Sequence, residues 1–341
     1  MRMNISSLGE FGFIDRITDG ITSTRECTIK GVGDDAAVIA GYADSYKLIS
    51  SDMFLEGIAF DLTYTPLKHL GFKCVVAAAS DIVAMNGTAE QITFSIGLSQ
   101  KITLEMAEEL YDGVRVACDK YSIDLVGGDT TPSMTGMAIS VTAVGSVSKD
   151  KITYRNGAKN ADLLCVTGDL GAAFMGLKLL EREKRVLNGN AGVAPKFDGY
   201  EYLLERQLHP LLRSDVIEAL DKSGIVPTSM IDISDGLASE VLHLCRHSGL
   251  GARLYLSKIP ISSKCFELGD EMNIDPVMAA LNGGDDYELL FTVPVDRYED
   301  VLRVGGIDVI GHMTAPDKGA MLVTPDGAEI ALTAQGWSSQ E

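Results

Sequence analysis

Six short segments of this 341-residue sequence place an aspartate at a glycine- or serine-containing corner beside an apolar run. They are GVGDD (31–35), SSD (50–52), SD (80–81), GGDTT (127–131), DISDG (232–236) and GGDD (283–286). Glycine lets the backbone turn sharply and lets a ligand approach closely. Carboxylate oxygens are the hard ligands that Mg²⁺ takes together with phosphate oxygens and water. The pattern predicts a site for Mg²⁺ and phosphate, although an aspartate after glycine is also common in ordinary turns.

Asp81 is the most informative of these aspartates. It falls on the apolar stripe of an expected helix, with the spacing of Leu67, Leu70, Cys74 and Ala78. A carboxylate on an apolar face is costly unless it is paired or binds a metal ion. We therefore expect Asp81 to be a metal ligand, with a salt bridge or a capping role as the alternative.

Asp232 and Asp235 flank the expected start of another helix, and Ser234 lies near its cap. The free amides of a helix N-terminus bind phosphate, and neighbouring carboxylates hold a cation that bridges to it. Plain N-capping by Ser234 or Asp235 explains the same residues and is compatible with that role.

The elements that must position these corners follow from periodicity and capping signals. Helices are expected at 10–19, at 65–85 with Thr65 as cap, at 103–121 with Thr103 as cap, at 171–183, on both sides of Pro210, and at 236–247. Strands are expected at 36–39, 46–51, 92–98, 125–126, 137–147, 161–167, 289–293 and 309–313. The Gly/Asn-rich segment 186–197 is expected to be a loop. A change in composition near Asp150 predicts two domains, 1–149 and 150–341.

Composition excludes several classes of protein. With 29 basic and 48 acidic residues, the net charge is −19, which opposes binding to nucleic acid or anionic lipid. No apolar run is long enough for a membrane span, and no signal peptide is recognisable at the first residues. The six cysteines are widely spaced and form no C-x-x-C pair, so we expect reduced thiols and a cytoplasmic location.

Four other known motifs do not fit this sequence. The segment GVGDDA (31–36) matches a dinucleotide-binding pattern, but two carboxylates would face the pyrophosphate and no helix is expected after it. Neither a P-loop nor the protein-kinase H-R-D and D-F-G motifs occur. His243 and His247 have a zinc-ligand spacing but lack the glutamate of H-E-x-x-H.

Taken together and in order, the motifs resemble those of the thiamine-monophosphate kinase family, within the aminoimidazole-ribonucleotide-synthetase-like superfamily. The matching segments are GVGDDAAVI (31–39), SDIVAMNG (80–87), GGDTTPS (127–133), YRNGAK (154–159), IDISDGL (231–237) and GGDDYELLFTV (283–293). The resemblance implies an α/β (α+β) fold of two domains. Its N-terminal domain carries a mixed sheet that pairs across a homodimer into a barrel-like core. Its C-terminal α/β domain has a sheet with flanking helices and completes the site.

The resemblance also implies the site residues. The Mg²⁺ ligands it implies are Asp35, Ser50, Ser51, Asp52, Asp81, Asp129, Asp232 and Asp235. The ATP contacts it implies are Gly128, Asp129, Arg155 and Ser234, and the contacts with thiamine monophosphate are Asp285 and Trp337. The chain departs from the family where Ala59 replaces a substrate-facing histidine, where Ala78 replaces an asparagine, and where Asp285 stands in place of a frequent glutamate.

The reaction implied is direct in-line transfer of the γ-phosphate of ATP to thiamine monophosphate, assisted by several Mg²⁺ ions. The second pKa of a phosphate monoester is about 6, so the acceptor is already mostly ionised and needs no general base. Trp337 would offer its ring to the thiazolium cation, although packing of the C-terminal tail explains it equally well. Two alternatives stay open: another ATP-using enzyme of the same superfamily, or a non-catalytic protein that binds nucleotide and Mg²⁺.

Overall fold

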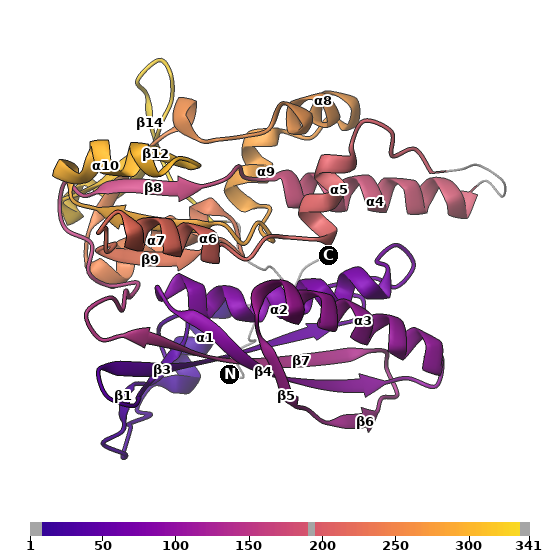
Figure 1. The fold of residues 1–341 in the computed structure, drawn as a ribbon. Coiled ribbons are helices and arrows are strands. Elements are labelled where there is room, and N and C mark those ends of the chain that lie inside the picture. Colours follow the sequence, from indigo (N-terminus) through magenta and orange to yellow (C-terminus); the bar gives the residue numbers. More distant parts are fainter. Residues whose placement is uncertain (1–8, 190–194, 335–341) are drawn as a thin grey trace, which may run out of the picture.

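The computed structural model describes residues 9–189 and 195–334, which form two seven-stranded sheets with helices between and beside them (Figure 1). The first sheet contains β1 (Thr28–Lys30), β2 (Ala37–Ala40), β3 (Ser45–Leu55), β4 (Thr88–Leu98), β5 (Asp124–Gly127), β6 (Thr130–Pro132) and β7 (Ala138–Ser148). The second sheet contains β8 (Leu163–Thr167), β9 (Ser229–Asp232), β10 (Gly251–Tyr255), β11 (Leu289–Val293), β12 (Ile307–Thr314), β13 (Ala320–Val323) and β14 (Glu329–Ala331). The helices of the first part are α1 (Gly9–Thr18), α2 (Leu67–Ala84) and α3 (Leu104–Tyr121). Those of the second part are α4 (Ala172–Gly189), α5 (Glu201–Leu208), α6 (Ser214–Lys222), α7 (Leu237–Ser248), α8 (Ser263–Met272), α9 (Pro276–Asn282) and α10 (Tyr298–Val304).

Both sheets are mixed, which confirms the expected α/β class. The first sheet has the order β1-β2-β3-β7-β4-β5, and β6 also pairs with β4. Its long central ladder β3–β7–β4 is antiparallel, while β5 and β6 run parallel to β4. The second sheet has the order β14-β13-β10-β12-β8-β11-β9. The change from one sheet to the other falls between Ser148 and Leu163, the segment where the sequence predicts the domain boundary.

Helix α2 is the central element of the molecule. It lies between the first sheet and the second part of the chain (Figure 1), and 15 of its 18 residues are buried. An apolar surface on all sides is typical of a helix enclosed by other elements. It crosses α3 so closely that a Cβ on Gly71 would lie 2.0 Å from the Leu110 carbonyl oxygen, and one on Gly113 would lie 1.8 Å from that of Lys68. Only glycine permits this approach of two helix backbones.

The helix starts differ in part from the expectations. Thr103 caps α3 as predicted, because its side chain accepts a hydrogen bond from the amide of Met106. The Thr65 cap is wrong: Pro66 is the cap residue of α2 and no side chain caps that helix. Helix α7 begins after Gly236, with φ +105°, so Ser234 lies outside the helix and is not its cap.

The helix α4 was also expected to be shorter. It continues to Gly189, so the loop predicted from Val186 begins later than expected. The Gly/Asn content of this segment does not end the helix at once, because single poor helix formers cost only about 1 kcal/mol each. Residues 190–194 lie outside the described part of the chain.

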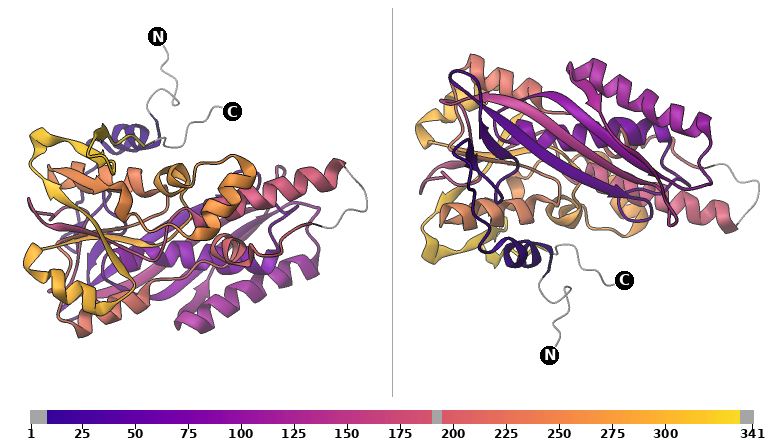
Figure 2. Two further views of the ribbon diagram at one scale, coloured as in Figure 1. Left: turned by 90° about the horizontal axis from the view of Figure 1, so that it is seen from above. Right: turned by 90° about the horizontal axis from the view of Figure 1, so that it is seen from below.

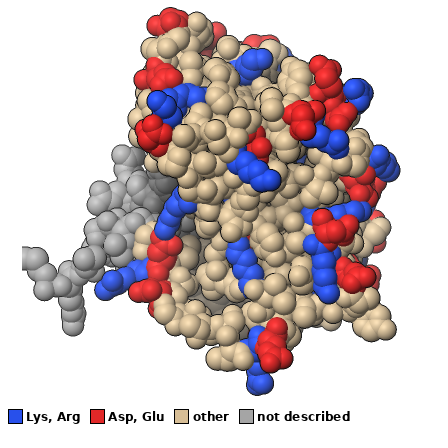
Figure 3. Space-filling view, turned by 90° about the vertical axis from the view of Figure 1, so that its left-hand side faces the viewer, with Lys and Arg blue, Asp and Glu red and all other residues tan. Residues whose placement is uncertain are grey.

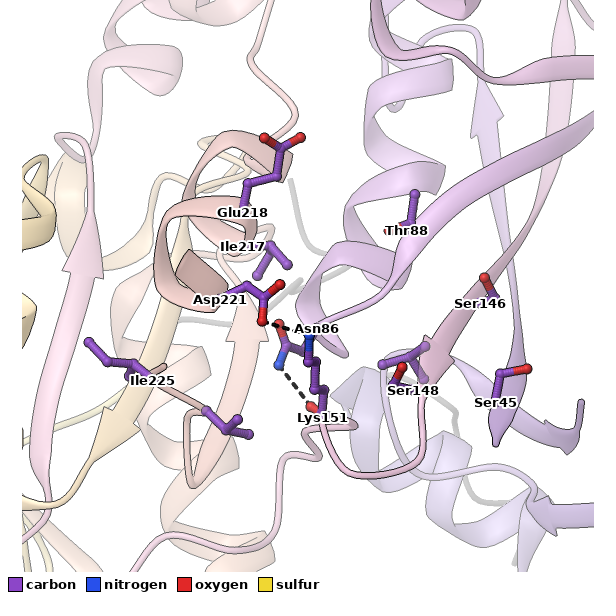
Figure 4. Close-up of a pocket in the computed structure, with 12 residues that line it drawn as sticks. Ser45, Asn86, Thr88, Ser146, Ser148, Lys151, Ile217, Glu218, Asp221 and Ile225 are labelled. Carbon is purple, nitrogen blue, oxygen red and sulfur yellow. Dashed lines mark hydrogen bonds and ion pairs between the residues drawn. The ribbon is translucent and has the colours of Figure 1, made fainter. Parts of the chain in front are cut away.

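One hydrophobic core joins the two parts. Phe72, Val76 and Ile82 of α2 belong to the same buried cluster as Leu220 of α6 and Phe291 of β11. At the edge of this junction lies a cavity of about 290 Å³ between the strand ends of the first sheet and helix α6 (Figure 4). The Lys151 ammonium pairs with Asp221 at 2.6 Å there, and the Asn86 amide donates to the Lys151 carbonyl oxygen at 2.8 Å.

The second face of the first sheet carries no helix. Seen from below in Figure 2, the strands of this sheet lie nearest the viewer. Apolar side chains on or beside this face are exposed, among them Met53 (69%), Val126 (61%) and Leu55 (42%). Apolar exposure of this kind is a common feature of protein–protein contact surfaces.

Figure 3 shows how the charged side chains are distributed over one face of the molecule. Basic and acidic side chains are intermixed over that face and form no extended basic patch. None of the described helices is both long enough and apolar enough to cross a bilayer.

Candidate functional site

Three aspartates converge between the two parts of the molecule. Asp35 follows β1, Asp81 lies on α2, and Asp232 ends β9. Each offers a carboxylate oxygen, and these three oxygens all lie within 4.8 Å of one another. Like charges held this close repel strongly unless a proton or a cation compensates them. Among the residues that the structure describes, this is the one group of three or more acidic, histidine or cysteine side chains with such geometry.

Two neighbouring serines fix the carboxylates. Ser80, next to Asp81 on α2, donates to Asp232 at 2.7 Å. Ser50 of β3 donates to Asp81. Each hydroxyl occupies one lone pair of its carboxylate and leaves the others free for a cation.

Asp52 of β3 adds a fourth carboxylate beside these three aspartates. Residues 50 and 52 share one face of the strand, because side chains of a strand alternate between faces. The Oδ2 atoms of Asp35 and Asp52 are buried and have no hydrogen-bond partner in the described structure. A buried carboxylate oxygen without a donor is costly and indicates a ligand that binds there.

The carboxyl groups hold protons more tightly than usual. Burial, with a smaller contribution from the charges of Asp232 and Asp34, raises the pKa of Asp35 to about 7 against the opposing effect of Arg155. Burial also raises the pKa of Asp52 and that of Asp232 to about 6. For Asp81, burial and then the charges of Asp232, Asp52 and Asp35 raise the pKa well above its usual value. A bound cation reverses this preference, because it favours the ionised carboxylates.

Arg155 lies at one end of this cluster. Its Nη2 atom donates to Asp35 Oδ1 at 2.6 Å, and its backbone amide donates to Asp34 Oδ1 at 3.1 Å. Its Nε atom is buried and has no partner in the described structure. Arginine presents donors in a planar fork that matches phosphate oxygens, so this free donor is suited to an anionic ligand.

The segment between β9 and α7 follows Asp232 directly in the chain and lies beside the acidic cluster. Ser234 and Asp235 are exposed there, directly before the start of α7. The Asp235 amide donates to Glu240 Oε1 at 3.1 Å, so this glutamate of the first turn satisfies an amide at the helix start. Burial, followed by the charges of Asp235 and Asp232, raises the pKa of Glu240 well above its usual value.

Asp285 sits beside this segment but is already paired. Lys73 of α2 donates to Asp285 Oδ2 at 2.8 Å, and the Tyr287 hydroxyl donates to Oδ1 at 2.9 Å. Burial alone would raise the pKa of Asp285, but Lys73 and the hydrogen bonds hold it below its usual value. Asp285 is therefore ionised and held in place between the two parts of the chain.

Several residues expected at the site are not brought to this cluster. The Ser51 hydroxyl lies on the opposite face of β3 from Ser50 and contacts Thr142 Oγ1 at 3.1 Å. Gly128 and Asp129 form the exposed turn between β5 and β6. Because β7 and β4 separate β3 from β5, this turn lies about 14 Å from Asp52 across the sheet. Their roles stay predictions, and Trp337 lies outside the described residues.

Ala59 and Lys73 contribute to one small cavity. It is also lined by His69 and Gln207, and it lies beside the Lys73–Asp285 pair. Ala78 is fully buried within α2. The structure does not test the effect of these departures on the choice of substrate.

The sequence interpretation missed three residues that the structure places at the site. Ser80 is adjacent to Asp81, and Glu240 stands one helical turn after Asp235, where an acidic residue often satisfies the amides of a helix start. Lys73 is a single cation inside the apolar stretch of α2. A lone charge in such a stretch requires a partner, and that was the available signal.

The donor set fits Mg²⁺. Three convergent carboxylates, two serine hydroxyls and unpartnered buried oxygens are all hard oxygen ligands. No thiol lies in the group of potential ligands, which makes a soft-metal site a poor fit. The residues that would hold Mg²⁺ are therefore Asp35, Asp81 and Asp232.

Comparison with known proteins agrees with this geometry. Residues 33–147 match the family model "AIR synthase related protein, N-terminal domain". The thiamine-monophosphate kinase of Aquifex aeolicus (strain VF5) is 31% identical over 310 residues, covering 90% of this chain and 94% of that protein. That of Escherichia coli (strain K12) is also 31% identical, covering 96% and 97% of the two chains. The solved structure of AaThiL complexed with AMPPCP and TMP superposes with a TM-score of 0.81 at 30% identity, covering 97% of each chain.

These matches cover 90% to 97% of this chain. Identity of this level over nearly the whole length of both proteins establishes common ancestry and a common fold. The chain belongs to the thiamine-monophosphate kinase family.

Proposed function

We propose that this protein transfers the γ-phosphate of ATP to thiamine monophosphate, giving ADP and thiamine diphosphate. The observation that carries the proposal is the convergence of Asp35, Asp81 and Asp232 within 4.8 Å, beside Arg155, whose buried Nε donor has no partner in the described structure. A relative of 30% identity whose solved structure contains AMPPCP and TMP supports the choice of both substrates.

Charge compensation is the physical requirement of this reaction. Two polyanions must meet in a protein of net charge −19, and their repulsion must be cancelled. Bound Mg²⁺ supplies that positive charge and polarises the phosphate oxygens. Asp35, Asp81 and Asp232 hold their ligand oxygens ready, while Ser50 and Ser80 orient two of these carboxylates.

The remaining residues bind and align the reactants. Arg155 offers its Nε donor to a phosphate oxygen, and Ser234 and Asp235 stand exposed at the start of α7. An oxygen of the acceptor phosphate forms the new P–O bond as the bond from the γ-phosphorus to the β,γ-bridging oxygen breaks. The electron pair of the broken bond leaves with ADP. Since the acceptor is ionised near neutral pH, no side chain has to remove a proton.

A direct assay tests the function. The purified protein is incubated with ATP, MgCl₂ and thiamine monophosphate, and ADP and thiamine diphosphate are quantified. Asp232→Asn should lower kcat by about 10²–10³-fold, the scale of losing one element of charge stabilisation. Asp317→Asn changes an exposed aspartate far along the chain and serves as the matched control. ATP binding without any thiamine diphosphate would instead support a non-catalytic nucleotide-binding protein.

We also propose that the protein is a homodimer that forms through the uncovered face of the first sheet. Support comes from the exposed Met53, Leu55 and Val126 on or beside that face. Two such faces in contact would bury these side chains. Light scattering should give twice the chain mass of 36.5 kDa, and Val126→Asp should reduce it to one chain mass. A monomeric wild-type protein at micromolar concentration would contradict this assignment.

A further inference from the structure

Lys73 is the buried cation that pairs with Asp285 at the edge of the site, and the proposed function gives it no part in binding either substrate. Among the described residues it is the one lysine in the buried class, with 7% of its surface exposed. Its neighbours on α2, Phe72 and Cys74, are fully buried. A charged ammonium in such surroundings requires compensation by an anion and by hydrogen bonds.

The compensation comes from the other part of the molecule. Lys73 Nζ lies 2.8 Å from Asp285 Oδ2, and the side chains are 8% and 35% exposed. With the Gln207 amide in the orientation that satisfies both of its ends, its oxygen accepts from Lys73 Nζ at 3.1 Å. Lys73 thus binds two groups of the second part from a helix of the first part.

Asp285 in turn is tied to the exposed segment before α7. Its backbone has φ +61°, an uncommon conformation for a residue with a side chain. Its amide donates to the Ser234 carbonyl oxygen at 2.8 Å, and the Tyr287 amide donates to that of Ile233 at 2.9 Å. A Cβ on Gly284 would meet the Ser234 carbonyl oxygen at 2.3 Å, so the two segments are in direct backbone contact.

Helix α2 therefore holds the Ser234–Asp235 segment at two points. Ser80 binds Asp232 directly at 2.7 Å, and Lys73 acts through Asp285. These two positions lie about two helical turns apart, or roughly 10 Å along the helix axis. Two separated attachments fix both the position and the orientation of the segment, whereas one attachment would leave it free to rotate.

We propose that Lys73 is a positioning residue for the phosphate acceptor. It holds the ionised Asp285, and through Asp285 the Ser234–Asp235 segment, in the place where the acceptor meets the acidic cluster. This inference rests on the proposed function, since it assigns the acceptor to the Asp285 side of the site. Without Lys73, the Asp285 carboxylate would be one more uncompensated anion facing Asp235 and would repel an incoming phosphate.

The lysine at the other junction provides a matched control. Lys151 also joins the two parts by an ion pair, with Asp221, but its side chain is 37% exposed and lies beside the separate cavity at α6 (Figure 4). Lys73→Met and Lys151→Met therefore remove the same charge from two interdomain ion pairs. Only the first pair is linked to the Ser234–Asp235 segment.

The experiment measures the two substrates separately. Steady-state KM for thiamine monophosphate and kcat are measured for wild type, Lys73→Met, Lys73→Arg, Asp285→Asn and the double variant Lys73→Met/Asp285→Asn. AMPPCP binding with MgCl₂ is followed by calorimetry, and thermal unfolding reports folding. Lys73→Met should raise the acceptor KM by about 10- to 100-fold, the scale of a misplaced binding group, while AMPPCP affinity changes by less than about threefold.

Two further measurements test the charge of Lys73 and its coupling to Asp285. Lys73→Arg retains the cation and should recover most of the acceptor affinity, and Lys151→Met should leave both constants unchanged. The double variant should be no worse than Lys73→Met alone, because residues in one network are not additive. Equal losses of acceptor and AMPPCP affinity would overturn the inference, as would independent, additive losses in the double variant.

The outcome is separable from the proposed function. If the wild-type protein forms no thiamine diphosphate, the proposed function fails on that result alone. The same double-variant cycle is then read from binding of thiamine monophosphate measured by calorimetry. Absence of any coupling between Lys73 and Asp285 in that measurement refutes the positioning role by itself.

Discussion

The replacement Asp81→Asn tests whether the acidic cluster is built for a cation. The substitution removes one negative charge and keeps the size of the side chain and an acceptor for the Ser50 hydroxyl. Asp35 and Asp232 each offer an oxygen within 4.8 Å of Asp81, and at an effective dielectric constant of about 20 each such pair costs about 3.5 kcal/mol. Partial protonation relieves part of that repulsion, since the pKa of Asp81 is raised well above its usual value.

We therefore expect Asp81→Asn to stabilise the metal-free protein by about 2 kcal/mol at pH 7.5, which corresponds to about 4–8 °C in Tm for a domain of this size. The same variant should lose the stabilisation that Mg²⁺ gives. A ligand at one hundred times its Kd adds about 2.7 kcal/mol to the wild-type protein, and the variant should gain little of it. It should also lose most of its kinase activity.

The pH dependence of the free energy of unfolding tests the same argument independently. Asp35 and Asp232 have pKa values raised to about 7 and about 6, so between pH 4 and 7 the folded protein binds more protons than the unfolded chain. The free energy of unfolding in EDTA should therefore fall as pH rises from about 4 through 7. Asp81→Asn should make this slope shallower, because the raised pKa of Asp81 itself no longer contributes to it.

Differential scanning calorimetry in EDTA and in MgCl₂, between pH 5 and 8, measures all of these quantities. Asp317→Asn, on an exposed 3₁₀ turn, is the control for removal of any carboxylate. A lower Tm of Asp81→Asn than of wild type in EDTA would refute the reasoning. So would an equal gain in Tm on addition of MgCl₂.

Three other predictions follow from the described contacts. Arg155→Met leaves buried Asp35 without its cation and should lower the free energy of unfolding in EDTA, measured with urea, by about 3 kcal/mol. Mg²⁺ should stabilise this variant more than it stabilises wild type. An unchanged urea midpoint would contradict the prediction. Glu288→Gln leaves two buried arginines uncompensated and should cost about 3–5 kcal/mol in the same assay, whereas a cost below 1 kcal/mol, typical of exposed pairs, would be evidence against a buried network. Gly113→Ala improves helix propensity by about 1 kcal/mol but places a Cβ 1.8 Å from the Lys68 carbonyl oxygen. We therefore expect a net loss of about 1–3 kcal/mol in the free energy of unfolding. A stabilised variant would show that the two helices separate easily.

Much of the secondary structure was predictable from local sequence. Helix α3 with its Thr103 cap and strand β11 at Leu289–Val293 follow from periodicity and capping chemistry alone. The short strands β10, β13 and β14 and the helices α8, α9 and α10 were not predicted. These are brief elements, so the local pattern carries little information about them.

The sequence predicts which residues form the acidic corners, but not how these residues are arranged in space. Neighbours in sequence separate in space: Ser50 faces Asp81 while Ser51 faces Thr142 across the sheet. That difference follows from strand alternation once the register is known, and the β3–β7 pairing fixes the register. Asp129 carries the same glycine-corner signature as the others and yet lies on an exposed turn two strands away from β3.

The sequence by itself determined the residue types: hard oxygen ligands at sharp turns, an apolar central helix, and an acidic chain that requires cations to hold phosphate. Tertiary structure alone decided which of these residues meet. Asp35, Asp81 and Asp232 come together because α2 is packed between the two parts of the chain, and the same helix brings Lys73 to Asp285. Contacts of this kind join residues up to 212 positions apart, and only the packing of whole elements against one another determines them.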